Sequence, residues 1–307
     1  MHLTSEQRDR AIGAILGTAV GDALGAGYEF GPPLRDDAEV RMMGGGTFDW
    51  APGEWTDDTS MAVPILEAVA AGPLTEHALD GIVAAWAAWA RDAKDVGIQT
   101  RRVFGLLDAP TAAGARVAAE RVHDTSGRSA GNGSLMRTAP LALAFLDDPA
   151  ALAAAAREVS ALTHFEQDAG DACAIWCLAI RHAILAGEYD IRSAVVDAQP
   201  RDVERWLGLV EEAEAKHPRD FELNGWVIEA FQGAWSAIAR SASFSDAVKR
   251  AVRGGRDTDT VAAIAGALAG ARWGASSIPG EWVRVLHGWP GMDAAGLRLL
   301  GERALDG

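Results

Sequence analysis

The sequence predicts an all-α fold, a compact domain built from many helices. Apolar residues return at helical intervals along most of the chain, whereas strand-length alternation of apolar and polar residues is nearly absent. Hydrophobic residues make up 49% of the 307 residues and charged residues 23%, a balance typical of a folded globule. No linker or short-period repeat divides the chain, so we expect one domain over residues 1–307.

The expected helices follow one another with recognisable starts and stops. Periodic apolar runs predict helices over residues 79–89, 152–162, 173–184 and 227–238. Asp148 followed by Pro149 is typical of an N-cap and a first-turn proline, and Asn224 stands where it can cap the run that follows. Gly187 predicts a helix end, and Pro218 should follow the end of another helix.

Two further segments are marked by small residues at helical spacing. Glycine recurs at every fourth position in both: Gly13, Gly17, Gly21 and Gly25, then Gly266, Gly270 and Gly274. Glycine costs about 1 kcal/mol relative to alanine inside a helix, so this repetition needs a packing reason. A membrane helix pair is one explanation, but Asp22 and Glu29 interrupt the first segment and Arg272 closes the second before it spans a bilayer. We therefore expect close helix packing inside a soluble domain.

Composition and charge exclude several classes of protein. The 43 acidic and 28 basic residues give a net charge of -15, which argues against autonomous nucleic-acid binding and suits a protein that concentrates cations. Cys173 and Cys177 share one helix face and are interpreted as buried thiols. The N-terminal residues show no secretory signal pattern, so we expect a cytoplasmic protein, with no membrane association. No spare apolar helix is evident, and a monomer is expected.

Aspartates and threonines crowd together twice, each time directly before an apolar run. The two segments read WTDDTSM and GGRDTDTV. Asp57 and Asp58 are adjacent, so on a helix their side chains diverge by about 100° and can serve different ions. Asp257 and Asp259 converge in an extended or turn segment, so we expect both in a loop before a helix that begins near Val261. Packing of the two glycine-rich helices would bring the four carboxylates together.

The ligand chemistry of these clusters indicates a metal site. Four acids in one pocket repel one another unless cations lie among them. Carboxylates with the Thr56 and Thr260 hydroxyls form an all-oxygen set, which favours Mg²⁺, leaves Mn²⁺ or Ca²⁺ open and argues against zinc. Two ions about 3.5–4 Å apart would activate water or clamp substrate oxygens. N-capping of two helices is the alternative explanation.

Six segments in order resemble the motif series of the ADP-ribosylglycohydrolases, the DraG-like family. They are GDALGAGYEF, WTDDTSM, KDVGIQT, SAGNGSLMR, THFEQDAGDAC and GGRDTDT, and they extend over about the first 270 residues. The resemblance implies a compact all-α, ADP-ribosylglycohydrolase-like domain with a central binuclear Mg²⁺ or Mn²⁺ site. It also implies hydrolysis of the bond between the anomeric ribose carbon of ADP-ribose and a modified acceptor.

The resemblance assigns roles position by position. The expected metal ligands are Thr56, Asp57, Asp58, Asp257, Asp259 and Thr260. Glu29 matches an acidic residue beside the ions and is the candidate catalytic or gating carboxylate, with Asp58 as the other candidate base. Without the family, Glu29 would be interpreted as a solvated loop acid.

The same resemblance implies a substrate-binding set. Its members are Asp95, Gly97, Ser129, Gly131, Asn132, Gly133, Ser134 and His164. Asp95 and Gly97 match a segment on the ribose and leaving-group side, and the glycine-rich loop can offer backbone N–H groups to a diphosphate. Taken alone, Asp95 could be a surface acid, the loop ordinary turn chemistry and His164 a helix C-terminal histidine.

Three positions depart from the family pattern. Arg256 separates the glycine pair from DTDT, so the register of that loop is open. Pro64 falls within the helix that WTDDT should begin and predicts a kink or a short first turn. Ala130 replaces an aromatic residue of some relatives, so adenine or ribose stacking would come from elsewhere, with Phe221 and Trp226 as candidates.

The expected reaction is metal-dependent release of ADP-ribose from an ADP-ribosylated protein or a small ADP-ribose conjugate. Arginine is the favoured acceptor, because GDALG and KDVGIQT resemble the bacterial arginine-directed branch. ADP-ribosyl-serine, O-acetyl-ADP-ribose and ADP-ribosylated nucleobases stay open as substrates. Two other classes stay open as well: a non-catalytic ADP-ribose-binding protein and a metal-assisted phosphoester hydrolase.

Overall fold

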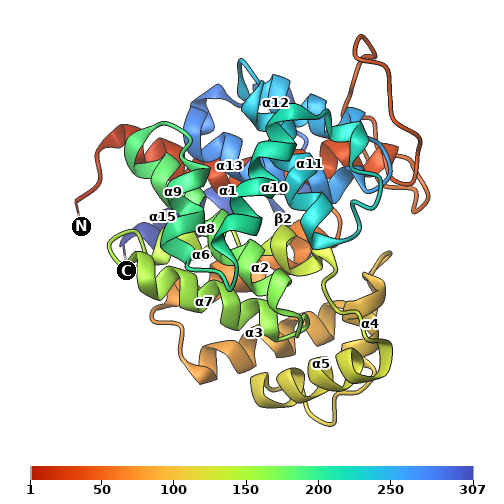
Figure 1. Ribbon diagram of the computed structural model, residues 1–307, viewed down its shortest axis with the longest axis vertical. Coiled ribbons are helices and arrows are strands. Elements are labelled where there is room, and N and C mark those ends of the chain that lie inside the picture. The colour runs from red at the N-terminus through yellow and green to blue at the C-terminus, as the bar shows by residue number, and fades with distance from the viewer. Residues whose placement is uncertain (1, 307) are drawn as a thin grey trace.

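The computed structural model describes residues 2–306 and confirms the all-α fold (Figure 1). The first helices are α1 Ser5–Gly25, η1 Ala26–Tyr28, α2 Asp57–Ala71, α3 Glu76–Trp89, α4 Ile98–Phe104, α5 Ala112–Ser126, η2 Asn132–Arg137, α6 Leu141–Ala144, α7 Pro149–Ala161 and α8 Gln167–Ala186. The others are α9 Ile191–Ala198, α10 Val203–Ala215, η3 Pro218–Asp220, α11 Val227–Ala239, α12 Phe244–Arg253, α13 Thr258–Trp273, η4 Ala275–Ser277, α14 Gly280–Val283 and α15 Ala294–Asp306. A small antiparallel hairpin pairs β1 (His287–Gly288) with β2 (Met292–Asp293).

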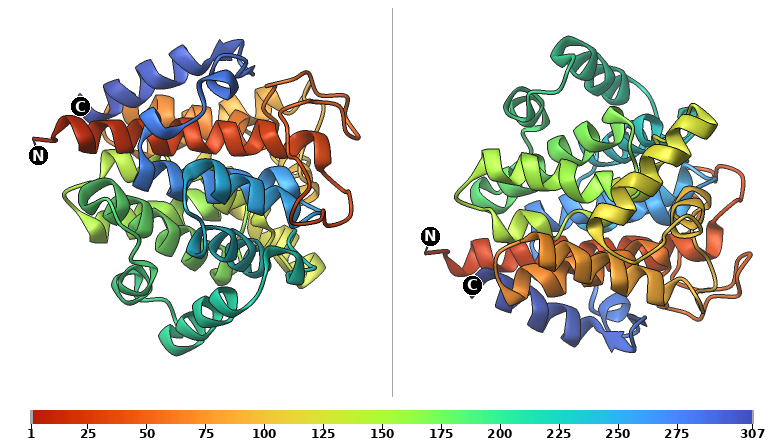
Figure 2. Two further views of the ribbon diagram at one scale, coloured as in Figure 1. Left: turned by 90° about the horizontal axis from the view of Figure 1, so that it is seen from above. Right: turned by 90° about the horizontal axis from the view of Figure 1, so that it is seen from below.

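The centre of the fold is an antiparallel contact between α1 and α13, which lie side by side in both views of Figure 2. A Cβ atom on Gly17 would lie 2.1 Å from the carbonyl oxygen of Gly266. A Cβ atom on Gly21 would lie 1.9 Å from the carbonyl oxygen of Ala262. Only glycine allows the two backbones to approach so closely, and the prediction that the glycine series serves helix packing is confirmed.

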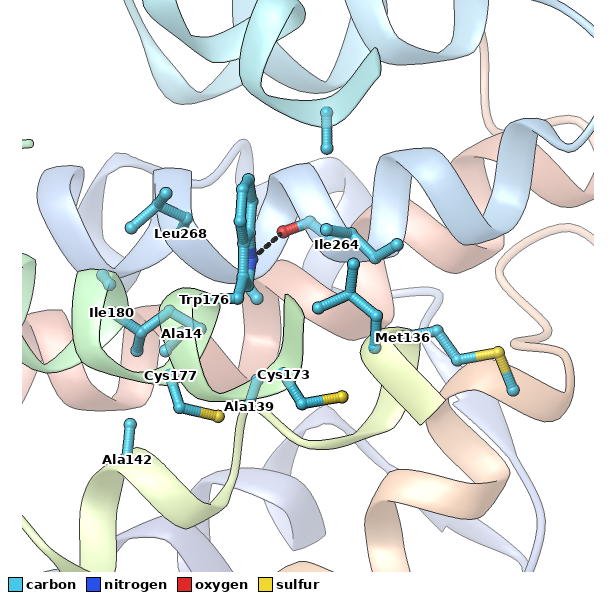
Figure 3. Packing of buried hydrophobic residues seen from close by; sticks show 14 of the residues in the cluster. Ala14, Met136, Ala139, Ala142, Cys173, Trp176, Cys177, Ile180, Ile264 and Leu268 are labelled. Atoms are coloured by element: carbon cyan, nitrogen blue, oxygen red, sulfur yellow. Dashed lines mark hydrogen bonds between the residues drawn. The ribbon is translucent and has the colours of Figure 1, made fainter. Parts of the chain in front are cut away.

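The core surrounds this pair, with α8 packed against α13 (Figure 3). Trp176 Nε1 donates a hydrogen bond to the Ile264 carbonyl oxygen at 3.0 Å and so ties the two helices together. Cys173 and Cys177 are buried and unlinked, as expected, and burial raises the pKa of both thiols. A buried thiol with a raised pKa is a poor nucleophile, so both cysteines serve packing.

Two helices are apolar and long enough to span a membrane by length and composition. They are α1 extended through η1, Ser5–Tyr28, and α8, Gln167–Ala186. Within their most apolar windows, 89% and 72% of the residues are buried inside the protein. Both are interior helices of this fold.

Most predicted helix boundaries are confirmed. The Asp148 side chain accepts a hydrogen bond from Ala151 N and caps α7, whose first residue is Pro149. Gly187 closes α8 in the left-handed conformation with a φ of 76°. α2 runs from Asp57 without a break through Pro64, so the short first turn expected there is wrong.

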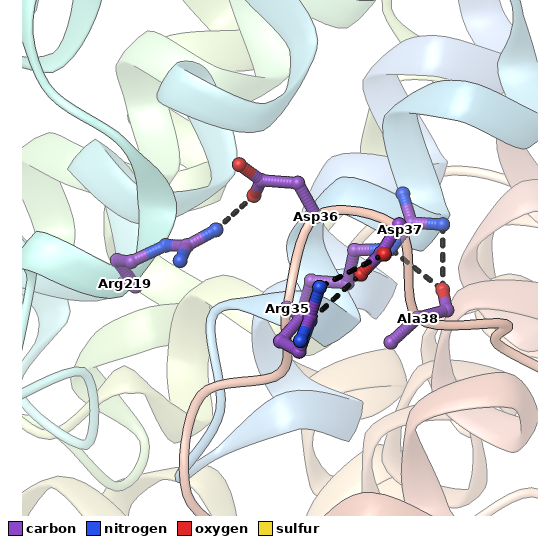
Figure 4. A network of polar contacts seen from close by, with 6 residues as sticks. Arg35, Asp36, Asp37, Ala38 and Arg219 are labelled. Carbon is purple, nitrogen blue, oxygen red and sulfur yellow. Dashed lines mark hydrogen bonds and ion pairs between the residues drawn. The ribbon is translucent and has the colours of Figure 1, made fainter.

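A long non-helical segment, residues 29–56, projects from the helical body and covers the loop before α13 (red to orange, Figure 1). Arg253 donates from Nε and Nη2 to the Ala38 carbonyl oxygen at 3.0 and 2.8 Å, and Arg219 pairs with Asp36 (Figure 4). These contacts fasten the middle of the segment to α12 and η3. Glu29 is the first residue of this segment, and its last residues, Trp55 and Thr56, lead directly into Asp57 and Asp58 at the start of α2.

Candidate functional site

The first turns of α2 and α13 meet at the end of the central helix pair. A Cβ atom on Gly25, the last residue of α1, would lie 2.5 Å from the backbone nitrogen of Asp259. Three residues earlier, the Asp22 carboxylate accepts hydrogen bonds from Thr56 N at 2.8 Å and Thr59 N at 2.9 Å. The helix α1 thus positions the start of both acid-bearing helices, and the two acid clusters lie together.

Helix capping does not account for these acids. Thr56 is the N-cap of α2 but makes no side-chain cap bond, because Asp22 serves the backbone N–H groups there. The Thr56 hydroxyl instead lies 2.9 Å from Asp58 Oδ2 and 3.3 Å from Asp259 Oδ2. Asp257 is the N-cap of α13 and also makes no side-chain cap bond. The carboxylates of Asp58 and Asp259 therefore meet at the Thr56 hydroxyl.

The helix α13 begins earlier than expected. Its first residue is Thr258, not a position near Val261, and Asp259 lies in its first turn. The prediction of a loop is wrong for Asp259, because the Thr258 hydroxyl bonds to the Gly25 carbonyl oxygen at 2.9 Å and fixes the helix start against α1. Asp257 keeps a non-helical conformation with φ -85° and ψ 74°, which allows the two carboxylates to converge.

The acids form two groups of three, and the ligand oxygens within each group lie within 4.8 Å of one another. One group contains Asp22, Asp58 and Asp259, and the other contains Glu29, Asp257 and Asp259. Asp259 belongs to both. Asp58 Oδ1 and Asp259 Oδ1 are buried without a hydrogen-bond partner among residues 2–306. Buried polar atoms normally have partners, so these oxygens fit a bound cation that supplies the missing interaction.

The electrostatics of the site agree with this fit. Burial raises the pKa of Asp58 and of Asp259 well above the ordinary value, and neighbouring carboxylates raise both further. Burial and then repulsion from Asp257 and Asp95 raise the pKa of Glu29 to about 9. Divalent cations among these groups act in the opposite direction, because they favour the ionised carboxylates. An oxygen-only set suits Mg²⁺ or Mn²⁺.

Glu29 reaches the site through a backbone pairing with the loop before α13. Phe30 N donates to the Arg256 carbonyl oxygen at 2.6 Å, and Arg256 N donates to the Gly31 carbonyl oxygen at 2.7 Å. Phe30 and Arg256 both adopt positive φ angles, 62° and 65°. Arg256 is therefore a turn residue of the loop before α13, and it connects this loop to the segment of residues 29–56 that carries Glu29.

Asn132 and Asn224 hold Asp257 from the other side. Asn132 Nδ2 donates to Asp257 Oδ2 at 2.8 Å and to the Asn224 carbonyl oxygen at 2.9 Å. The Asn224 side chain accepts from Asp257 N at 3.2 Å and donates to the Gly255 carbonyl oxygen at 3.0 Å. The prediction that Asn224 caps α11 is wrong. Its side chain bonds to the loop before α13, and the N-cap of α11 is Trp226.

The expected metal ligands Asp57 and Thr260, and Asp95 of the expected substrate-binding set, are the next residues of the site. Asp57 is buried but belongs to neither carboxylate group, and its Oδ2 accepts a hydrogen bond from Gly97 N at 3.3 Å. Asp95 is half-buried, and burial raises its pKa. Thr260 is buried beside Asp257, whose pKa is raised by burial and lowered in part by the Asn132 and Thr260 side chains.

The glycine-rich loop closes on His164. A Cβ atom on Gly131 or Gly133 would lie 3.3 or 3.4 Å from His164 Nε2, so these glycines leave room for the ring. Arg137 Nη2 donates to Thr163 Oγ1 at 2.7 Å, and the Thr163 hydroxyl is hydrogen-bonded to His164 Nδ1, also at 2.7 Å. Burial, and then the charge of Arg137, lower the pKa of His164 well below its usual value. The ring is therefore neutral, and because Nδ1 bonds to the Thr163 hydroxyl, Nε2 is the ring nitrogen left for a ligand.

The two serines of this loop face inward. Ser129 exchanges hydrogen bonds with Glu166 and lies 2.8 Å from His123 Nδ1 through its hydroxyl. The Ser134 hydroxyl accepts a hydrogen bond from Ser160 at 2.9 Å. Both side chains hold the loop in shape, and the backbone N–H of Ser129 is also engaged, by Glu166 Oε2 at 2.8 Å.

A cavity of about 500 Å³ opens beside the loop. Its lining includes Arg128, Ala130, Gly131, Leu223 and Trp226. Of the two aromatic residues expected to stack on a base, Trp226 is 39% exposed in this cavity, whereas Phe221 is 3% exposed and belongs to the core. Trp226 is therefore the residue available for stacking.

Comparisons with known proteins identify the family. The family model described as ADP-ribosylglycohydrolase matches residues 3–307. The chain belongs to the ADP-ribosylglycohydrolase family. The ADP-ribosylarginine hydrolase Tri1 of Pseudomonas putida (strain GB-1) is 35% identical over 295 residues, which cover 92% of this chain and 75% of the relative.

Two further similarities support the same family. The ADP-ribosyl-[dinitrogen reductase] glycohydrolase of Rhodospirillum rubrum is 30% identical, with 91% of this chain and 90% of the relative covered. A solved structure described as an ADP-ribosylglycohydrolase-related protein complex matches 99% of both chains at 32% identity with a TM-score of 0.77. The expected resemblance is confirmed, and so is the prediction that this ADP-ribosylglycohydrolase is a hydrolase of ADP-ribosyl glycosidic bonds.

Sequence reasoning missed two polar residues of this ADP-ribosylglycohydrolase. In the sequence, Asp22 served only as an argument against a membrane helix. A single acid in an apolar, glycine-rich helix, however, itself indicates a buried polar site, because a buried carboxylate needs partners. Arg137 is fully buried, lies 4.1 Å from the centre of the Trp86 ring and positions Thr163. Burial lowers the pKa of Arg137 to about 9, and no spacing rule in the sequence marks it.

Proposed function

We propose that this protein hydrolyses the glycosidic bond between ADP-ribose and an arginine side chain, with two Mg²⁺ ions as cofactors. The observation that carries the proposal is the pair of carboxylate groups that share Asp259 and contain buried oxygens with no hydrogen-bond partner in residues 2–306. The arginine acceptor is supported by the names of relatives in Pseudomonas putida and Serratia proteamaculans, both called ADP-ribosylarginine hydrolase Tri1.

We assign the two cations to the residues that converge at the helix starts. One ion would be held among Asp22, Asp58 and Asp259, and the other among Glu29, Asp257 and Asp259. When bound, such ions supply Lewis acidity that orients ribose hydroxyls and activates water. Mn²⁺ fits the same oxygen ligands.

The substrate is proposed to extend from these acids into the cavity beside the glycine-rich loop. The adenine would stack on Trp226, and the backbone N–H groups of Gly131 and Gly133 would bind the diphosphate. The neutral His164 offers Nε2 to a ribose hydroxyl.

Glu29 is the proposed base, with Asp58 as the alternative. A water oxygen forms a bond to the anomeric carbon while the carbon–nitrogen bond breaks. The departing guanidine nitrogen keeps the bonding electron pair, and Glu29 takes the proton from the water. That proton then returns to the guanidine, so the products are ADP-ribose and an unmodified arginine.

Release of free ADP-ribose tests the proposal. The purified protein is incubated with arginine-, serine-, acetyl- and nucleobase-linked ADP-ribose, each with Mg²⁺, with Mn²⁺ and with EDTA. Release from the arginine linkage with Mg²⁺ and its loss in EDTA is the expected result. Release from a different linkage would refute the acceptor, and full release in EDTA would refute the metal.

A further inference from the structure

A second cavity of about 310 Å³ shares no lining residue with the cavity beside the glycine-rich loop. Its walls include four tryptophans from three distant parts of the chain: Trp50, Trp55, Trp89 and Trp289. We call it the tryptophan cavity. Thr56 and Asp57 belong to its lining, so it is continuous with the acid-bearing start of α2.

The walls of this cavity are held rigidly. Trp55 is almost fully buried, and its Nε1 donates a hydrogen bond to the Trp289 carbonyl oxygen at 3.1 Å. Trp55 N also donates to the His287 carbonyl oxygen at 3.0 Å. A Cβ atom on Gly288 would lie 2.3 Å from Trp55 Nε1, so the hairpin packs directly on this ring. The small C-terminal hairpin therefore fixes one wall of the tryptophan cavity.

The cavity is strongly acidic. Four carboxylates line it, and Lys94 is the single basic residue among its lining residues: Glu54, Asp57, Asp92 and Asp95 are the acids. Lys94 pairs with Glu54 at 2.8 Å. Asp92 and Asp95 form no salt bridge among residues 2–306. An uncompensated negative charge therefore remains next to the tryptophan rings.

The position of Lys94 indicates what the cavity attracts. Its ammonium lies 4.8 Å from the centre of the Trp50 ring and donates to Glu54 and to the Asp49 carbonyl oxygen. A cation of the chain itself thus sits between an aromatic face and a carboxylate. This combination binds ammonium and, more favourably, the flat guanidinium group.

We propose that the tryptophan cavity binds the guanidinium group of the acceptor arginine, with Trp50 and Asp92 as residues that select it. The inference rests on the proposed function, because it adds the acceptor subsite to that reaction. A serine acceptor joined through an O-glycosidic bond is neutral, as is an acetyl ester, and neither gains from aromatic faces and carboxylates. Selection of arginine over these acceptors would therefore arise here, and Lys94 would compete with the arginine for the same surroundings.

The competition by Lys94 gives two variants with opposite expected effects. Asp92→Asn removes a carboxylate and should weaken guanidinium binding by about three- to tenfold. Lys94→Gln removes the rival cation and frees Glu54, so it should strengthen binding by a similar factor. Asp147→Asn changes an exposed acid that does not line the cavity and serves as the matched control. A purely structural disturbance would weaken binding in both cavity variants.

Agmatine, a small guanidinium compound, is the probe for binding. Its dissociation constant is measured by calorimetry and tryptophan fluorescence with the full-length Mg²⁺-loaded protein and the three variants. The KM and kcat for an ADP-ribosyl-arginine peptide and for O-acetyl-ADP-ribose are measured alongside. We expect the constants for agmatine and for the arginine peptide to rise in Asp92→Asn and fall in Lys94→Gln, with kcat and the O-acetyl KM unchanged.

Three results would overturn the inference: no binding of agmatine, weaker binding in both cavity variants, or equal KM changes for both substrates. Trp50→Leu, checked for folding by circular dichroism, provides a second test, since its loss of the ring should weaken agmatine binding. Failure of the proposed function is distinguishable. In that case the wild-type protein releases no ADP-ribose from arginine, while agmatine binding still follows Asp92 and Lys94.

Discussion

Replacement of Gly21 by alanine tests whether the central helix contact supports the metal site. Alanine is favoured over glycine in a helix by about 1 kcal/mol, so intrinsic propensity alone predicts a more stable protein. The added Cβ atom, however, would lie 1.9 Å from the Ala262 carbonyl oxygen. Ordinary contacts begin near 3.5 Å, so α1 and α13 must separate by roughly 1.5 Å. Overpacking of this kind costs about 1–3 kcal/mol, and the backbone offers no rotamer to relieve it.

The measurement is the urea midpoint and the melting temperature of Gly21→Ala beside Gly81→Ala. Gly81 is exposed in α3, and a Cβ atom there would meet nothing within 4 Å. We expect Gly81→Ala to be slightly stabilised, by about 0.4–1 kcal/mol, and Gly21→Ala to be clearly destabilised. The Mg²⁺-induced rise in melting temperature should also shrink in Gly21→Ala, because Asp259 moves with α13. Equal stability of the two variants would refute the reasoning.

Three further changes test the site. Asp259→Asn should lower turnover at least about 100-fold and abolish stabilisation by Mg²⁺, because Asp259 belongs to both carboxylate groups; turnover near the wild-type rate would contradict this. Trp226→Ala should raise the dissociation constant of ADP-ribose by about 5- to 30-fold in calorimetry through loss of stacking, and an unchanged constant would remove Trp226 from the site. In EDTA, the urea midpoint should fall as the pH rises from 4.5 to 9. Folding raises the pKa of Glu29 from 4.5 to about 9. Between these pH values the carboxyl group is ionised in the unfolded chain and protonated in the folded protein, so a rising pH stabilises the unfolded chain relative to the folded protein. A midpoint that rises with pH would contradict the sign.

The sequence predicted those features that depend on local periodicity. The glycine series at Gly13 to Gly25 indicated close helix packing because a four-residue interval defines one helix face. The cap at Asp148 and the end at Gly187 followed from side-chain size and backbone conformation alone. The start of α13 did not, because it depends on a bond from Thr258 to Gly25, far away in the sequence.

Features that join distant segments escaped prediction. Asn224 has the side chain of a good N-cap, yet the loop before α13 engages it more fully than the helix that follows. The tryptophan cavity combines Trp50, Trp89 and Trp289, and no periodicity relates these positions. Residue type indicates what a side chain is able to do, and only the packing of the chain determines which partner it meets.

The glycine contact and the acidic site depend on each other. Six carboxylates lie close together at the site and repel one another, and burial raises the pKa of each: Asp22, Glu29, Asp57, Asp58, Asp257 and Asp259. The site therefore opposes folding until cations bind. A loosely packed scaffold would relieve that repulsion by moving the helices apart. Because α1 and α13 touch backbone to backbone, Asp22 and Asp259 cannot separate without loss of the central packing. The glycines therefore do more than fill space: they hold the carboxylates at a spacing that divalent cations, and not protons alone, can satisfy.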